Sequence, residues 1–84
     1  MSNDSPLQGQ VGVVTGASTG FGRVIAETLA ANGARVFICG RSVKGLEETR
    51  NRIEAAGGEA ECAAFDITDT RKLVEFLNLS LIHI

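Results

Sequence analysis

The chain has 84 residues, a hydrophobic content of 44%, a charged content of 21% and a formal net charge of −2. This length allows one small domain, and the balance of apolar and charged residues is typical of a globular protein rather than a disordered one. The negative charge and the scattered Lys and Arg residues exclude the basic surface that nucleic acid or an anionic membrane attracts, so we expect neither as a partner.

The N-terminal segment and the two cysteines indicate a cytoplasmic protein. Residues 1–6 are polar and lack the basic and apolar regions of a signal peptide. No apolar run approaches the roughly 20 residues of a membrane span. Cys39 and Cys62 lie in apolar runs without metal-ligand spacing, which favours small buried thiols in a reducing compartment. We expect a flexible lead-in over residues 1–9.

Two apolar runs of strand length flank a segment with helical periodicity. Residues 11–15 are rich in Val and end at a glycine, as expected of a buried strand. From Phe21 the apolar residues recur at helical spacing, and Asn32-Gly33 suits the left-handed end of a helix. Residues 35–39 form the second run. Because a helix connects the two strands, we expect them to be parallel.

The same alternation continues in the second half. Ser42 is a predicted N-cap for a helix over residues 43–56, and residues 59–65 form a third candidate strand. After a turn at residues 66–69, in which Asp69 is a predicted cap, a third helix should follow. Its predicted buried side consists of four apolar residues: Leu73, Val74, Phe76 and Leu77.

The order β-α-β-α-β-α predicts an α/β fold. We expect an incomplete, doubly wound parallel sheet of the Rossmann type over residues 10–78, with the first strand as an exposed edge. Residues 79–84 form an atypical tail without a functional interpretation, and an appended segment from a truncated coding sequence is one explanation for it. The tail either adds a short strand or extends the third helix; if it does neither, it is an exposed apolar end.

The connection between the first strand and the first helix reads Thr15-Gly16-Ala17-Ser18-Thr19-Gly20-Phe21-Gly22. In a phosphate-binding turn, Gly16 would let the chain turn sharply, Gly20 would let a pyrophosphate approach the backbone, and Gly22 would let the helix pack closely. The helix N-terminus supplies N–H groups, and Ser18 and Thr19 add hydroxyl donors. The alternative is a tight turn without a ligand. The strand–turn–helix context favours the phosphate site.

The spacing Thr-Gly-x-x-x-Gly-x-Gly, together with Asp66-Ile67-Thr68-Asp69 after the third strand, closely resembles the short-chain dehydrogenase/reductase family in its classical branch. The resemblance covers residues 9–77 and implies the N-terminal part of a family member. It implies a dinucleotide site that includes Phe21 in the turn, with the Asp66 side chain and the Ile67 backbone beside the adenine. Asp66 has an alternative role as an ordinary turn residue.

The end of the second strand bears on which dinucleotide binds. In NAD-binding Rossmann proteins, a carboxylate about 20 residues past the turn bonds the ribose 2′-hydroxyl. That position is Gly40 here, and Arg41 follows it. Glycine removes the repulsion of a 2′-phosphate, and a guanidinium can bond the phosphate through two N–H donors. The sequence therefore favours NADP(H) over NAD. The alternative is that Arg41 is an ordinary exposed residue.

The family's reaction implies a catalytic Tyr, a Lys four residues later and a Ser, but this chain contains no Tyr. We assign no catalytic or metal-binding residue, and whether the chain is an enzyme stays open. The single His, His83, is expected to be inert.

The leading hypothesis is an inactive, NADP(H)-binding fragment of a short-chain dehydrogenase/reductase. The full-length protein would interconvert an alcohol and a ketone and form a homo-oligomer. The alternatives are a non-catalytic nucleotide-binding module and a non-functional truncation product.

Overall fold

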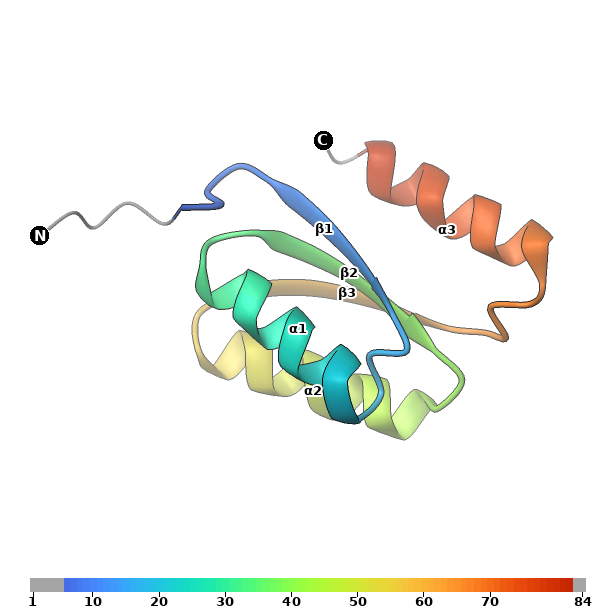
Figure 1. Ribbon diagram of the computed structural model, residues 1–84, viewed down its shortest axis with the longest axis horizontal. Helices are drawn as coiled ribbons and strands as arrows, with labels where there is room; N and C mark the ends of the chain where they lie inside the picture. The colour runs from blue at the N-terminus through green and yellow to red at the C-terminus, as the bar shows by residue number, and fades with distance from the viewer. Residues whose placement is uncertain (1–5, 83–84) are drawn as a thin grey trace, which may run out of the picture.

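Six elements alternate between strand and helix in the computed structural model, which describes residues 6–82 (Figure 1). They are β1 (Val11–Thr15), α1 (Gly20–Ala31), β2 (Arg35–Gly40), α2 (Val43–Ala55), β3 (Glu59–Ala64) and α3 (Thr70–Ile82). This is the predicted alternation, and of the two conformations considered for the tail, α3 shows the helical one through Ile82. The expectation for His83, and the first part of the predicted lead-in, lie outside the described residues.

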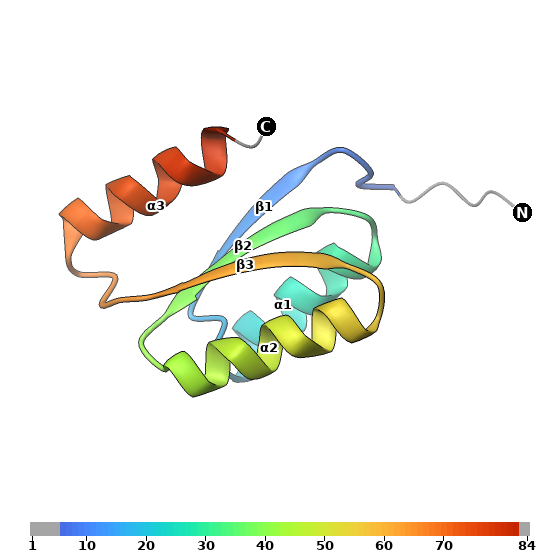
Figure 2. The same cartoon turned by 180° about the vertical axis from the view of Figure 1, so that it is seen from behind.

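The three strands form one parallel sheet in the order β1-β2-β3. Val11 pairs with Arg35, and Arg35 pairs in turn with Glu59. Helices α1 and α2 cover one face of the sheet, and α3 lies on the other face (Figures 1 and 2). The predicted incomplete Rossmann fold is therefore confirmed. Within residues 6–82, β1 has no strand on its outer side, as the sequence predicts.

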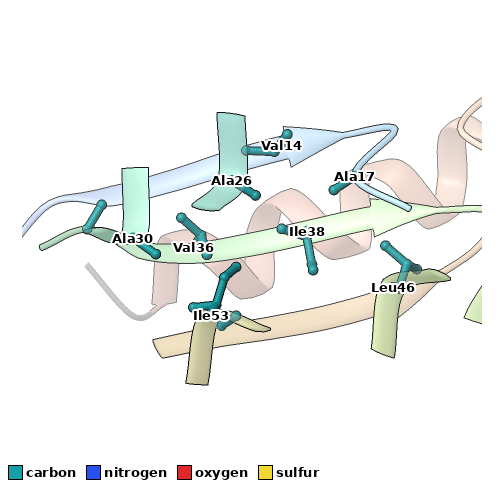
Figure 3. Close-up of a cluster of buried hydrophobic side chains, with 10 residues drawn as sticks. Val14, Ala17, Ala26, Ala30, Val36, Ile38, Leu46 and Ile53 are labelled. Carbon is teal, nitrogen blue, oxygen red and sulfur yellow. The ribbon is translucent and has the colours of Figure 1, made fainter. Parts of the chain in front are cut away.

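The larger core lies between the sheet and the helices α1 and α2 (Figure 3). Val36 and Ile38, alternate residues of β2, are completely buried there. Helix α1 meets them with small side chains such as Ala26, whereas α2 contributes the large residues Leu46 and Ile53. Small residues on α1 let that helix approach the sheet closely. As a result, the turn that precedes α1 is held tightly against the strands.

A smaller aromatic core lies on the face that α3 covers. Phe37 and Cys39, which alternate with Val36 and Ile38 along β2, are buried there with Phe65 and Phe76. The rings of Phe37 and Phe76 are 6.3 Å apart between centroids, in an edge-to-face arrangement. Phe76 is thus the main contact between α3 and the sheet.

Only two of the four residues predicted to be buried on α3 are buried or partly buried. Phe76 is buried and Leu73 is partly buried, but Val74 and Leu77 remain 54% and 40% exposed. A helix that packs alone on a three-stranded sheet contacts it through a narrow stripe, so the remaining apolar residues face outward. Helix α1 also leaves apolar residues exposed, among them Val24 at 56%.

The predicted helix ends and one of the two predicted buried cysteines are confirmed. The Ser42 hydroxyl accepts the Gly45 N–H at 3.0 Å, and Gly33 follows α1 with a left-handed φ of 99°. Cys39 is buried, and this burial raises the pKa of its thiol. The expectation that Cys62 is buried is wrong, because β3 is an edge strand and leaves this thiol partly exposed. No helix among the described residues has the length and apolar character needed to cross a bilayer.

Candidate functional site

The glycine-rich turn has a backbone that only glycine adopts easily. Gly16 and Gly20 have φ values of 67° and 60°, in the left-handed region. At Gly22 the constraint is spatial, because a Cβ atom there would collide with the carbonyl oxygen of Gly16. The turn therefore folds back against the first turn of α1.

The N-terminus of α1 keeps its N–H groups free of side-chain acceptors. Thr19 occupies the N-cap position with extended backbone angles, yet its hydroxyl accepts no capping bond, and the first turn of this described helix has no acidic residue. By contrast, α2 is capped by Ser42. An uncapped helix start carries a partial positive charge and unpaired donors, which is the arrangement that binds anions.

A hollow of about 280 Å³ opens beside the turn, at the ends of the parallel strands where α/β proteins bind ligands. It is lined by residues from the turn, from the connection after β2 and from the segment after β3, namely Gly16, Ser18, Thr19, Gly40, Arg41, Ser42 and Ile67. Five of the nine residues proposed from the sequence line this hollow: Gly16, Ser18, Thr19, Arg41 and Ile67. Gly20, Gly22 and Asp66 are not among its lining residues, and neither is Phe21, which is 88% exposed.

The turn fits closely against the end of β2. The Ala17 N–H donates to the Cys39 carbonyl oxygen at 3.1 Å. A Cβ atom on Gly40 would lie 2.6 Å from the Ser18 hydroxyl oxygen. A side chain at position 40 would therefore meet Ser18 directly.

Asp66 takes part in a local turn at the rim of the hollow. Its carboxylate oxygen Oδ1 accepts the Thr68 N–H at 3.0 Å and the Thr68 hydroxyl at 2.8 Å. These two bonds hold the pKa of the Asp66 carboxyl below its usual value, and the nearby Arg41 guanidinium lowers that pKa further. The turn role considered from the sequence is thus present. Asp69 caps α3 by accepting the Lys72 N–H at 3.3 Å, as expected.

Residues behind the turn escaped the sequence interpretation. Arg23 of α1 contacts the turn, as do Gly45 and Thr49 of α2. Ser42 lines the hollow as well as capping α2. Gly45 could have been noticed in the sequence, because a glycine inside a predicted helix is unfavourable and therefore suggests a packing constraint at that position. Arg23 and Thr49 could not, since they are 26 residues apart and meet only in the fold.

A family model described as short chain dehydrogenase matches residues 10–81. Among curated proteins, the fatty acyl-CoA reductase of Acinetobacter baylyi is 43% identical over 63 residues, which are 75% of this chain and 21% of that protein.

Solved structures agree with the family match. A metagenomic short-chain oxidoreductase in complex with NADP is 44% identical and superposes with a TM-score of 0.85 over 92% of this chain and 35% of that one. A 3-oxoacyl (acyl-carrier-protein) reductase from Agrobacterium tumefaciens C58 with NADP bound is 38% identical, with a TM-score of 0.72 over 79% of this chain and 26% of that one. The chain thus spans about a third or less of the length of these relatives.

Proposed function

The chain belongs to the short-chain dehydrogenase family, and from this premise we propose that residues 10–78 form the NADP(H)-binding part of an oxidoreductase. The whole protein would transfer hydride between a nicotinamide cofactor and an alcohol or ketone. The observation that carries the proposal is the hollow in which the uncapped start of α1, the glycine-rich turn and Arg41 meet.

The pyrophosphate of the cofactor would lie on the turn between Gly16 and Gly22. There the N–H groups at the start of α1 and the hydroxyls of Ser18 and Thr19 supply donors to an anion. Gly20 keeps this approach open, and Phe21 would contribute its backbone N–H, since its side chain points to solvent. This geometry holds for any dinucleotide.

The adenosine half would lie between β2 and β3, where Arg41 and Ile67 line the hollow. The Arg41 guanidinium would bond the 2′-phosphate, and Gly40 leaves no carboxylate to repel it. Asp66 stands at the rim beside Arg41 and would contact the adenine from there. NADP is also the ligand of two similar solved structures. Together these observations favour NADP(H) over NAD.

Catalysis would depend on residues that this chain does not contain. The chain has no Tyr, so it lacks the acid/base residue that the family resemblance implies. We therefore propose that the 84-residue chain binds the cofactor without turning over a substrate.

The test is a calorimetric titration of the purified chain with NADPH and with NADH. We expect tighter binding of NADPH. Arg41→Met should weaken NADPH binding by about 10- to 100-fold, the range for a lost bond between a guanidinium and a phosphate, and should leave NADH nearly unchanged.

The matched control is Arg52→Met, which removes the same charge from an arginine that pairs with Glu27 and lies outside the hollow. Its affinity for both cofactors should equal that of the unmodified chain. A folded chain that binds neither cofactor would overturn the proposed site. Tighter binding of NADH would overturn the role of Arg41 alone.

A further inference from the structure

Arg23 lies in the first turn of α1 but turns inward, and its side chain is only 16% exposed. A cation at this place faces the positive end of the helix dipole, which is unfavourable by itself. Its guanidinium is held by acceptors on two other segments. Nη2 donates to the Ser18 carbonyl oxygen at 2.6 Å and to the Gly45 carbonyl oxygen at 3.1 Å, and it pairs with Glu48 at 3.3 Å.

Thr49 completes this contact from α2. It is completely buried, and its hydroxyl accepts the Arg23 Nε–H at 2.8 Å. The same oxygen lies 2.7 Å from the Ala17 carbonyl oxygen and 3.0 Å from that of Gly45, to either of which it can donate its hydrogen. Two successive carbonyl groups of the turn are therefore held from the same side, one by Thr49 and the other by Arg23.

Gly45 is what lets α2 come this close. A Cβ atom at this position would lie 2.8 Å from the Ser18 carbonyl oxygen and 2.9 Å from the Ser18 Cβ. The first turns of α2 are thus pressed against the back of the glycine-rich turn, and no side chain separates the two.

The held carbonyl groups determine where the turn's donors point. In a trans peptide the C=O and the following N–H point in opposite directions, and the described residues contain no cis peptide. With the Ala17 and Ser18 oxygens fixed toward α2, the N–H groups of Ser18 and Thr19 point away from it. The Ser18 nitrogen itself lies close to the hollow, 3.7 Å from the place of a Cβ on Gly40.

We propose that Arg23, Thr49 and Gly45 form a brace that fixes the turn's N–H groups in the orientation that receives a pyrophosphate. Arg23 is then a positioning residue, which acts through the backbone of Ser18 and does not touch the cofactor. A donor set that is already oriented loses less conformational freedom on binding, so the brace raises affinity for the pyrophosphate. This inference rests on the proposed function.

The experiment separates the pyrophosphate from the adenosine half by using two ligands. NADPH carries the pyrophosphate, whereas adenosine 2′-monophosphate carries only the part that Arg41 would bind. Both are titrated by calorimetry into the full chain and into Arg23→Met, Arg23→Lys, Thr49→Val and Arg52→Met. The Arg52→Met control removes another link between α1 and α2, the pair with Glu27 at 2.6 Å, which lies about one helical turn beyond Arg23.

Arg23→Met should weaken NADPH binding about tenfold or more and leave the binding of adenosine 2′-monophosphate unchanged. Lys keeps the charge but cannot make the same set of bonds, so Arg23→Lys should recover only part of the loss. Thr49→Val removes one hydroxyl at nearly constant volume and should reproduce the selective loss, which keeps the test valid if Arg23→Met does not fold. Arg52→Met should bind both ligands as the unmodified chain does.

Equal losses for the two ligands would show a general structural role and overturn the inference, as would full recovery by Arg23→Lys. Binding of neither ligand by the unmodified, folded chain would instead overturn the proposed function, and the inference with it. The two failures are therefore distinguishable.

Discussion

Gly45→Ala provides a sharp test of the contact between α2 and the glycine-rich turn. In an exposed helix interior, this substitution stabilises a protein by about 1 kcal/mol, because alanine has the higher helix propensity. Here the new methyl group would lie 2.8 Å from the Ser18 carbonyl oxygen and 2.9 Å from the Ser18 Cβ. These atoms belong to the turn and cannot rotate away, so the turn or the helix has to shift.

Overpacking of this kind costs about 1–3 kcal/mol of stability. Over most of this range the cost is larger than the gain from helix propensity. Subtracting the gain of about 1 kcal/mol leaves a net destabilisation of up to about 2 kcal/mol. For a domain of this size each kcal/mol lowers Tm by about 4–8 °C. The measurement is urea unfolding followed by circular dichroism, with the midpoint and the m-value compared between variants.

Asn51→Ala is the matched control, because Asn51 is an exposed residue of the same helix. It should stabilise the chain by about 0.5 kcal/mol through propensity alone. An increase in stability for Gly45→Ala as large as that of Asn51→Ala, or larger, would show that the close approach does not exist and would refute the reasoning.

Other residues of the hollow and the core have measurable consequences. Gly40→Asp combined with Ser18→Ala, which removes the hydroxyl that a new Cβ would meet at 2.6 Å, should reverse the preference from NADPH to NADH in calorimetry, by tenfold or more. A thiol reagent should modify Cys62 before the buried Cys39. The pKa of Asp66, followed by NMR, should lie below 3.8, so its contribution to stability is present above pH 3.8 and is lost as the pH falls through the lowered pKa.

The elements and the position of the hollow could be predicted because their determinants are local. Glycines at fixed offsets set the turn, and periodicity sets the strands and helices around it. Ser18 and Arg41 line the same hollow because β1 and β2 are parallel, and the carboxyl ends of parallel strands share one edge of the sheet.

The failures came from contacts that pattern alone does not encode. Val74 has the spacing of a buried residue, yet burial needs a surface to pack against, and a three-stranded sheet is too narrow to supply one. Cys62 is partly exposed for a related reason, because β3 is an edge strand. Arg23 looked like an ordinary polar residue of α1, and its partners come from a different helix.

The position of β1 at the edge of the sheet determines which part of a bound cofactor this chain would contact. Rossmann folds hold the two mononucleotides of a cofactor on opposite halves of the sheet, and the described residues supply only the half that runs from β1 to β3. Arg41 and the turn would bind the adenosine and the phosphates, whereas the nicotinamide would extend past β1 into water. Oxidised and reduced cofactor differ only in that ring. The affinity of this chain for the cofactor would therefore not depend on the redox state, and NADP⁺ and NADPH would bind with equal Kd.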